Sequence, residues 1–117
     1  MRVIIAGSRD ITDPKCLEGL ETWCNYDITE VVSGMAPGVD KLGIQWAALH
    51  NIPVKEFPAD WATYKRGAGR RRNLAMAEYA DALLAIWDGQ SPGTAHMIQT
   101  MQDLHKPTFV VIRKSNL

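Results

Sequence analysis

The chain has 117 residues, of which 46% are hydrophobic, so it can bury one core, and we expect a single domain over residues 1–117. Lys and Arg total 13, as do Asp and Glu, so the chain has no overall positive field to attract nucleic acid or an anionic membrane. Any recognition of an anion must therefore depend on local charge.

Apolar runs alternate with helical periods along the chain. Runs rich in β-branched residues predict strands at Arg2 to Ala6, Glu30 to Ser33, Val54 to Phe57, Ala82 to Trp87 and Thr108 to Ile112. Apolar steps of three and four predict helices through Leu17, Leu20 and Cys24, through Val39, Leu42, Trp46 and Leu49, and through Met97, Met101 and Leu104. Residues 67–82 predict a further helix with a weaker stripe carried by Leu74, Ala77 and either Ala80 or Asp81. The alternation indicates an α/β fold with a parallel sheet and helices on both faces.

Several kinds of site are not expected. Cys16 and Cys24 lack the spacing of a zinc or redox motif, so we interpret both as buried small hydrophobic residues. The three histidines, His50, His96 and His105, have no ligands at metal spacing, and we expect structural or solvent-facing roles for them. The start "MRVIIAG" is too short for a signal peptide and no apolar run is long enough to span a membrane, so we expect a cytoplasmic protein.

The loops that follow the first, second and fourth predicted strands share one composition. They read "GSRDITD", "SGMAPGVD" and "WDGQSPGT", and each combines glycine with Ser, Thr or Asp before a helix. Glycines let the backbone approach a ligand, and the free amides of a helix N-terminus favour an anion such as phosphate. Capping loops without a ligand are the alternative. The spacing matches neither GxGxxG nor the Walker-type loop, so it does not indicate a dinucleotide site.

These motifs resemble a known family. The segment "VVSGMAPGVDKLGIQWAALHNIPV" is similar to the SGxAxGxD segment of the DNA-processing protein A family. "MRVIIAGSRD", "GRRRNLAMAEYADALLAIWDGQSPGT" and the order of the motifs resemble the YspA-like proteins of the SLOG superfamily, which also contains the LOG phosphoribohydrolases. The resemblance covers nearly the whole chain. It implies a Rossmann-like fold that binds a nucleotide or a nucleotide-derived signal. For this fold we predict a five-stranded parallel sheet of order 3-2-1-4-5.

The chain departs from the LOG enzymes at their catalytic position. Their PGGxGTxxE motif carries a glutamate taken as catalytic, whereas "QSPGTAHM" matches it at Gly93 and Thr94 but has Met97 at the glutamate position. Their RKxxM motif reads "RNLAM" here, which places Arg72 at the arginine and Asn73 at the lysine. A methionine cannot act as an acid or base, so the resemblance does not favour LOG-type hydrolysis. A carboxylate from elsewhere is the alternative, from Asp88, Glu78 or Asp40.

The run "KRGAGRRRN" is the strongest local charge feature. Arginine donates two hydrogen bonds to one phosphate, and basic residues at a helix start oppose the helix dipole unless an anion binds there. We expect at least one of Arg70, Arg71 and Arg72 to contact the ligand, with Arg72 favoured by the resemblance. Trp61 and Tyr64, just before the run, either stack on a base or anchor the loop.

Ser8, Arg9, Asp88 and Ser91 follow the first and fourth strands and have competing interpretations. In a sheet of order 3-2-1-4-5 the two loops face each other, so these residues are placed to hold phosphate or ribose hydroxyls. The alternative is that Ser8 or Thr12 caps the first helix, which Asp13 and Pro14 open. The Asp-Gly pair at Asp88 is also typical of a plain turn.

We therefore favour binding of a nucleotide or nucleotide-derived small molecule. A LOG-like hydrolase that cleaves an N-glycosidic bond is the first alternative. Single-stranded DNA binding is the second, and the balanced charge argues against it. No cofactor, metal or membrane partner is expected, the catalytic residues are unknown, and Trp61 and the apolar helix faces are compatible with a homo-oligomer. The predicted ligand-binding residues are Gly7, Ser8, Arg9, Ser33, Gly34, Met35, Ala36, Gly38, Asp40, Arg71, Arg72, Asn73, Asp88, Ser91, Gly93 and Thr94.

Overall fold

The structure, a computed structural model, describes residues 1–20 and 27–113. Its strands are β1 (Arg2–Gly7), β2 (Glu30–Ser33), β3 (Val54–Glu56), β4 (Ala82–Trp87) and β5 (Thr108–Ile112). Its α-helices are α2 (Val39–Leu49), α3 (Trp61–Tyr64), α4 (Ala68–Tyr79) and α5 (Pro92–Asp103), and its 3₁₀ helices are η1 (Pro14–Leu17) and η2 (Lys65–Gly67).

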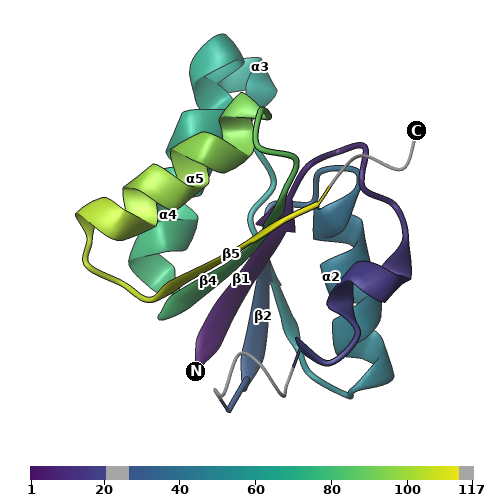
Figure 1. The fold of residues 1–117 in the computed structure, drawn as a ribbon. Coiled ribbons are helices and arrows are strands. Elements are labelled where there is room, and N and C mark those ends of the chain that lie inside the picture. Colours follow the sequence, from purple (N-terminus) through teal and green to yellow (C-terminus); the bar gives the residue numbers. More distant parts are fainter. Residues whose placement is uncertain (21–26, 114–117) are drawn as a thin grey trace.

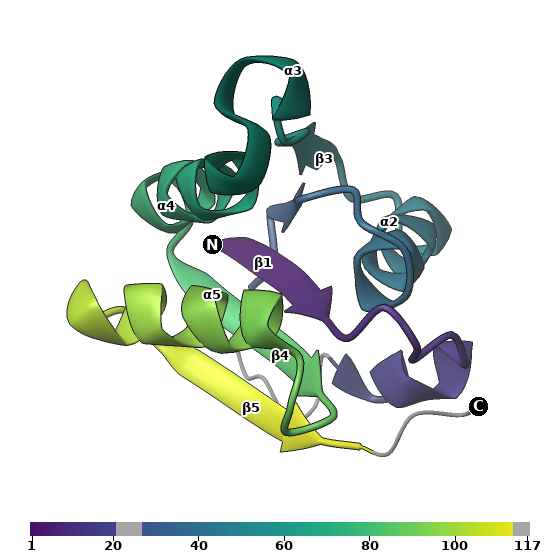
Figure 2. The same cartoon turned by 90° about the horizontal axis from the view of Figure 1, so that it is seen from above.

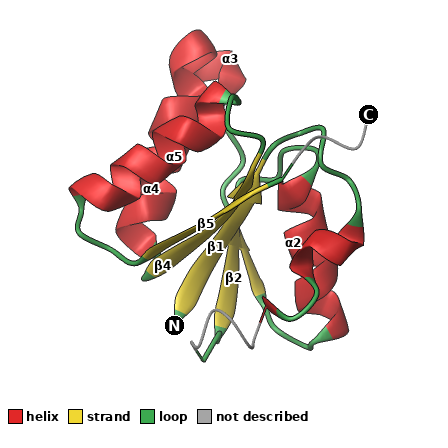
Figure 3. Cartoon of the chain, in the orientation of Figure 1, coloured by secondary structure: helices red, strands yellow, loops and turns green. Residues whose placement is uncertain are grey.

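All five strands form one parallel sheet in the order β3-β2-β1-β4-β5, which confirms the predicted fold class and strand order. Helices cover both faces of this sheet: α4 and α5 lie on one side, and η1 and α2 lie on the other (Figures 1 and 3). None of the helices in the described ranges is long and apolar enough to cross a membrane.

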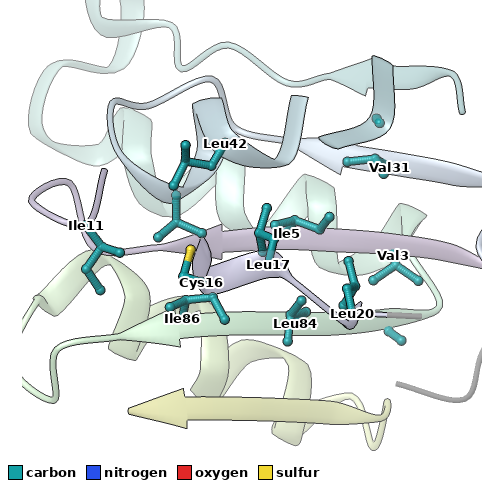
Figure 4. Packing of buried hydrophobic residues seen from close by; sticks show 13 residues of the cluster. Val3, Ile5, Ile11, Cys16, Leu17, Leu20, Val31, Leu42, Leu84 and Ile86 are labelled. Atoms are coloured by element: carbon teal, nitrogen blue, oxygen red, sulfur yellow. The ribbon is translucent and has the colours of Figure 1, made fainter. Parts of the chain in front are cut away.

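The central strand β1 supplies both halves of the core. Val3 and Ile5 face α2 and η1, while Ile4 and Ala6 face α4 and α5, and all four side chains are buried. A parallel strand covered on both faces is apolar throughout, which is why "VIIA" lacks the polar alternation of a half-exposed strand. Figure 4 shows the half of the core on the α2 and η1 side of the sheet, where Ile5 lies close to Leu17 of η1.

The helices that flank the sheet follow the predicted periods only in part. In α2, Val39 and Leu42 are buried and Trp46 is half-buried, but Leu49 is 81% exposed, so its assignment to the core stripe is wrong. Leu49 is the last residue of α2, at the end of the helix remote from the buried residues of its first turns. Leu104 likewise follows the last turn of α5 and is exposed.

Helix α4 turns a different face to the core than the sequence predicted. Leu74 was expected on its buried stripe and is 47% exposed, whereas the neighbouring Asn73 is 6% exposed. Met76 and Ala77 lie on the same buried face as Asn73. An amide can take this inward position because it finds hydrogen-bond partners there. The phase of α4 is therefore set by Asn73, Met76 and Ala77, and the prediction for Leu74 is wrong.

The first connection begins with a short 3₁₀ helix. Asp13 caps η1 by accepting a hydrogen bond from the Lys15 amide at 3.0 Å, and Pro14 takes the first helical position. Asp13 therefore caps this helix, in place of the predicted Ser8 or Thr12. Cys16 is buried in the core as predicted, and Cys24 lies outside the described residues.

The strand order reverses between β1 and β4, which places the ends of these neighbouring strands next to the start of α2 (Figure 2). Gly38 makes this junction possible. Its φ of +79° and ψ of −130° lie in a region that side-chain-bearing residues avoid, and a Cβ atom there would lie 2.3 Å from the Ser8 carbonyl oxygen. The close approach of the β1 loop to α2 therefore requires glycine at this position.

Replacing Gly38 by alanine tests this requirement. We expect Gly38→Ala to lower the free energy of unfolding by about 2 kcal/mol or more, because the new Cβ meets backbone and the φ is strained. The control is Gly67→Ala, where φ is −80° and no atom lies within 4 Å of the added Cβ. That change is expected to alter stability by less than about 1 kcal/mol. Urea unfolding measures both, and equal losses in the two variants would contradict the assignment.

Candidate functional site

A cavity of about 570 Å³ opens at the carboxyl end of the sheet. Its walls come from the end of β1, the loop between β2 and α2, the start of α2, the α3 to α4 segment and the first turns of α5. In Figure 1, α3 stands beyond the sheet at this same end of the molecule. The cavity is lined by Ala6, Gly7, Arg9, Asp10, Ala36, Asp40, Trp61, Arg66, Gly69, Arg70, Arg72, Asn73, Met76, Ser91, Pro92, Gly93, Thr94, His96 and Met97.

The predicted site residues divide into two groups by their place in the structure. Those that line the cavity are Gly7, Arg9, Ala36, Asp40, Arg72, Asn73, Ser91, Gly93 and Thr94. Those that lie around it without lining it are Ser8, Ser33, Gly34, Met35, Gly38, Arg71 and Asp88. Most of this second group hold the loops in place.

Ser8 is a structural junction at the end of β1. It is 1% exposed, its amide donates to the Ile86 carbonyl at 3.1 Å, and its carbonyl accepts from the Val39 amide at 3.3 Å. Its hydroxyl oxygen accepts from the Asp88 amide at 3.0 Å and lies 3.2 Å from the Ser91 hydroxyl. Ser8 thus ties β1, α2 and the loop after β4 together.

The loop after β4 is built around Asp88. Its carboxylate accepts hydrogen bonds from the amides of Gln90 and Ser91, each at 2.8 Å, and from the Ser91 hydroxyl at 3.0 Å. These donors, led by the Ser91 amide, lower the pKa of Asp88 to about 2. Asp88 is therefore ionised and committed to the turn that starts α5.

The loop between β2 and α2 is also held by its own side chains. The Ser33 hydroxyl accepts from the Met35 amide at 3.1 Å, and Met35 has a left-handed φ of 64°. The Asp40 carboxylate accepts from the Ala36 amide at 3.1 Å. These contacts bring Ala36 and Asp40 to the cavity while Ser33 and Gly34 stay buried beneath it.

Asp40 is the buried carboxyl group of the cavity. It is 5% exposed, and this burial raises its pKa to about 6, although the Ala36 amide and the charge of Arg72 act in the opposite direction. The effect of burial is the larger of the two. Asp40 therefore changes its protonation near pH 6.

Arg72 spans the cavity between two elements. Its Nη1 donates to the Gly34 carbonyl at 2.6 Å and its Nε donates to the Asn73 Oδ1 at 3.1 Å. A Cβ at Gly34 would lie 2.8 Å from the guanidinium, so glycine leaves the space that Arg72 fills. Burial lowers the pKa of Arg72, and the charge of Asp40 counteracts that effect. Arg72 thus has a structural role as well as a place in the cavity wall.

The arginines that follow α3 face in different directions. Arg66 and Arg70 line the cavity, whereas Arg71 lies over the ring of Tyr64, with 4.2 Å between its Cζ and the ring centroid. Trp61 lines the cavity and is 55% exposed. Of the two aromatic residues left open by the sequence, Trp61 is therefore the one placed to meet a ligand, and Tyr64 packs against Arg71.

Several lining residues are absent from the predicted set of ligand-binding residues. Arg66 lies in the basic run but was not singled out, and Arg70 was one of the three arginines of which at least one was expected to contact the ligand. His96 was expected to be structural or solvent-facing, and it lines the cavity, where its Nδ1 lies 3.1 Å from Asn73 Nδ2. Its position near the start of the last helix, directly after "SPGT", is the one sequence feature that pointed to the site.

Across residues 1–20 and 27–113, no group of three or more His, Cys, Asp or Glu side chains is arranged to hold a metal ion.

Comparison with known proteins gives one match. The model of the YspA, cpYpsA-related SLOG family matches residues 1–64, which include β1, β2, α2, β3 and α3. No curated protein and no solved structure matches the chain.

The burial of Asp40 predicts a pH dependence of stability. Its pKa is raised from 3.8 to about 6, so between these values the unfolded chain has released a proton that the folded chain retains. The free energy of unfolding therefore falls as pH rises through this window and levels off above it. Asp40→Asn lacks the titrating group. Relative to this variant, we expect the wild type to lose roughly 2 to 3 kcal/mol across the window.

Urea unfolding of both proteins at several pH values measures this difference. The other carboxyl groups titrate in both chains, so their contributions cancel in the comparison. Parallel curves for wild type and Asp40→Asn would contradict the account of Asp40.

Proposed function

Because the chain belongs to the YspA, cpYpsA-related SLOG family, we propose that it binds a nucleotide or nucleotide-derived ligand in the cavity at the carboxyl end of the sheet. In parallel α/β sheets, ligands bind outside the carboxyl ends of the strands, at the point where strand order reverses. The cavity lies at this point, beside the ends of β1 and the start of α5. The cytoplasmic location and a homo-oligomeric state stay predictions from the sequence.

The charge of the cavity wall is the observation that carries the proposal. Four arginines line it, namely Arg9, Arg66, Arg70 and Arg72, and the acidic residues beside them are Asp10 and Asp40. Four arginines outnumber these two carboxylates even when both are ionised, so the wall is positive on balance in a chain whose net charge is +0. A local excess of arginine is suited to a phosphate group.

The dimensions and the remaining wall fit a small nucleotide. A volume of about 570 Å³ lies within the range of small-molecule sites, about 300 to 1,000 Å³. Exposed Trp61 offers a ring face for a base, and Gly93, with no atom within 4 Å of where its Cβ would be, leaves the start of α5 open to a phosphate. A site of this size favours a small molecule over single-stranded DNA.

Neighbouring arginines provide the test. Arg70 lines the cavity and Arg71 lies over Tyr64, so Arg70→Ala and Arg71→Ala make the same change of charge on adjacent residues. We expect adenosine 5′-monophosphate to stabilise the wild type by about 2.7 kcal/mol at 100 times its dissociation constant. Arg70→Ala should weaken binding about tenfold, and Arg71→Ala should leave it nearly unchanged.

Thermal unfolding with adenosine 5′-monophosphate, ADP-ribose, inorganic phosphate and adenosine measures these effects. Stabilisation by the phosphorylated compounds, with adenosine much weaker, is the expected pattern. If none of the phosphorylated compounds stabilises the folded protein, or if both variants lose binding equally, the proposed site is wrong.

One observation favours a second candidate, hydrolysis of an N-glycosidic bond. The position of the LOG glutamate is Met97, but Asp40 lies in the same cavity and its pKa of about 6 suits a general acid or base. We rank this activity second because the Asp40 carboxylate already accepts the Ala36 amide. Its role in holding that loop explains its burial without catalysis.

Incubation with adenosine 5′-monophosphate separates the two candidates. Under the binding proposal, no adenine is released above the rate without protein, as chromatography of the mixture would show. Release of adenine by the wild type that is abolished in Asp40→Asn, with binding retained, would favour the hydrolase.

A further inference from the structure

The side-chain amide of Asn73 has only one possible orientation. Arg72 Nε is a donor and lies 3.1 Å from Asn73 Oδ1, while the Gly93 carbonyl is an acceptor and lies 3.2 Å from Asn73 Nδ2. If the amide were turned over, its NH₂ group would face the Arg72 Nε–H and its oxygen would face the Gly93 carbonyl oxygen, and neither pair can form a hydrogen bond. Asn73 is 6% exposed, so water cannot readily replace these partners. The amide nitrogen therefore faces α5.

This orientation fixes the proton of His96. Asn73 Nδ2 also lies 3.1 Å from His96 Nδ1, and because an amide NH₂ only donates, Nδ1 must accept. An accepting Nδ1 carries a lone pair, so the ring is neutral and its proton is on Nε2. Burial, followed by the charge of Arg70, lowers the pKa of His96 and favours the same neutral form.

Nε2 is the ring nitrogen of His96 that is left for a ligand. His96 lines the cavity, and its Nδ1 is occupied by Asn73. In the described part of the chain no group is hydrogen-bonded to Nε2. Arg70 and Arg72 line the same space, so a charged imidazolium would add to their mutual repulsion, whereas a neutral N–H adds a donor without adding charge.

We infer that His96 is a ligand-binding residue that donates its Nε2 proton to an anionic oxygen of the bound phosphate, and that Asn73 is the positioning residue that fixes this tautomer. The inference rests on the proposed function, because it assigns the group that meets the ligand's phosphate from the α5 side. It also states what the site rejects: a ligand group that can only donate, such as an ammonium, finds no acceptor at His96.

The tautomer is measured without ligand. Long-range ¹H–¹⁵N spectra of the labelled protein should show His96 protonated at Nε2 alone at neutral pH. In Asn73→Asp the carboxylate offers an acceptor in place of a donor, so Nδ1 should become protonated. A wild-type ring that carries its proton on Nδ1, or on both nitrogens, overturns the inference.

The donor is tested with a matched pair of substitutions. In His96→Gln the amide nitrogen reaches about as far as Nε2 and keeps a donor toward the cavity, whereas in His96→Asn the shorter amide can still accept from Asn73 but leaves no donor there. With adenosine 5′-monophosphate and inorganic phosphate as probes, we expect His96→Asn to bind about tenfold more weakly and His96→Gln to stay within about threefold of the wild type. Thermal unfolding without ligand checks that both variants fold.

The outcomes separate this inference from the proposed function. If the wild type binds the probes and both variants bind as tightly, the donor role of His96 is overturned while the proposed function stands. If His96→Gln loses as much affinity as His96→Asn, the ring does not act through Nε2 and the inference is again overturned. If the wild type binds neither probe, both the proposed function and the ligand role of His96 fail, and the spectra still decide the tautomer.

Discussion

The hydrogen bonds of Ser8 are the constraint on which the cavity depends. Its amide holds β4 through Ile86, its carbonyl holds the start of α2 through Val39, and its hydroxyl holds the turn before α5 through Asp88. The junction is close enough that a Cβ on Gly38 would strike the Ser8 carbonyl oxygen. Three walls of the cavity therefore meet at a residue whose side chain does not line it. A buried serine at the end of β1 gives the site its shape, and the residues around it give the site its chemistry.

The preference of the cavity for an anion follows from the uneven distribution of charged residues over the chain. The chain as a whole is balanced, yet its cavity collects arginines from the loop after β1, from η2 and from α4. Arg72 is anchored on the Gly34 carbonyl and is part of the architecture, whereas Arg66 and Arg70 are exposed and available to a ligand. Asp40 is the buried carboxyl group among these arginines, and even when ionised it cancels only one of their charges. An anion bound between them would complete this arrangement.

Apolar runs and helical periods were sufficient to predict the strands and the parallel α/β fold, because both depend on local composition, whereas the strand order was predicted only together with the family resemblance. The direction in which a helical side chain points was less predictable. Hydrophobicity predicts that Leu74 is buried and Asn73 exposed, but the structure shows the reverse. The reason is that the hydrogen-bond partners of the Asn73 amide come from α5 and from the neighbouring Arg72. Arg70 and Arg71 are indistinguishable in the sequence, and only the phase of α4 and the ring of Tyr64 separate them. Contacts between residues far apart in the chain leave no pattern in the local sequence from which the direction of a side chain could be predicted.

Mapping the binding of adenosine 5′-monophosphate on the ¹H–¹⁵N spectrum of the labelled protein tests the central claim most directly, because it locates the ligand. The account predicts saturable shifts confined to amides around the cavity, in the loops after β1 and β2 and at Gly93 and Thr94 at the start of α5. Shifts confined instead to the groove between η1 and α2, which is lined by Leu17, Trp46 and Leu49, would contradict it, as would a spectrum that the nucleotide leaves unchanged.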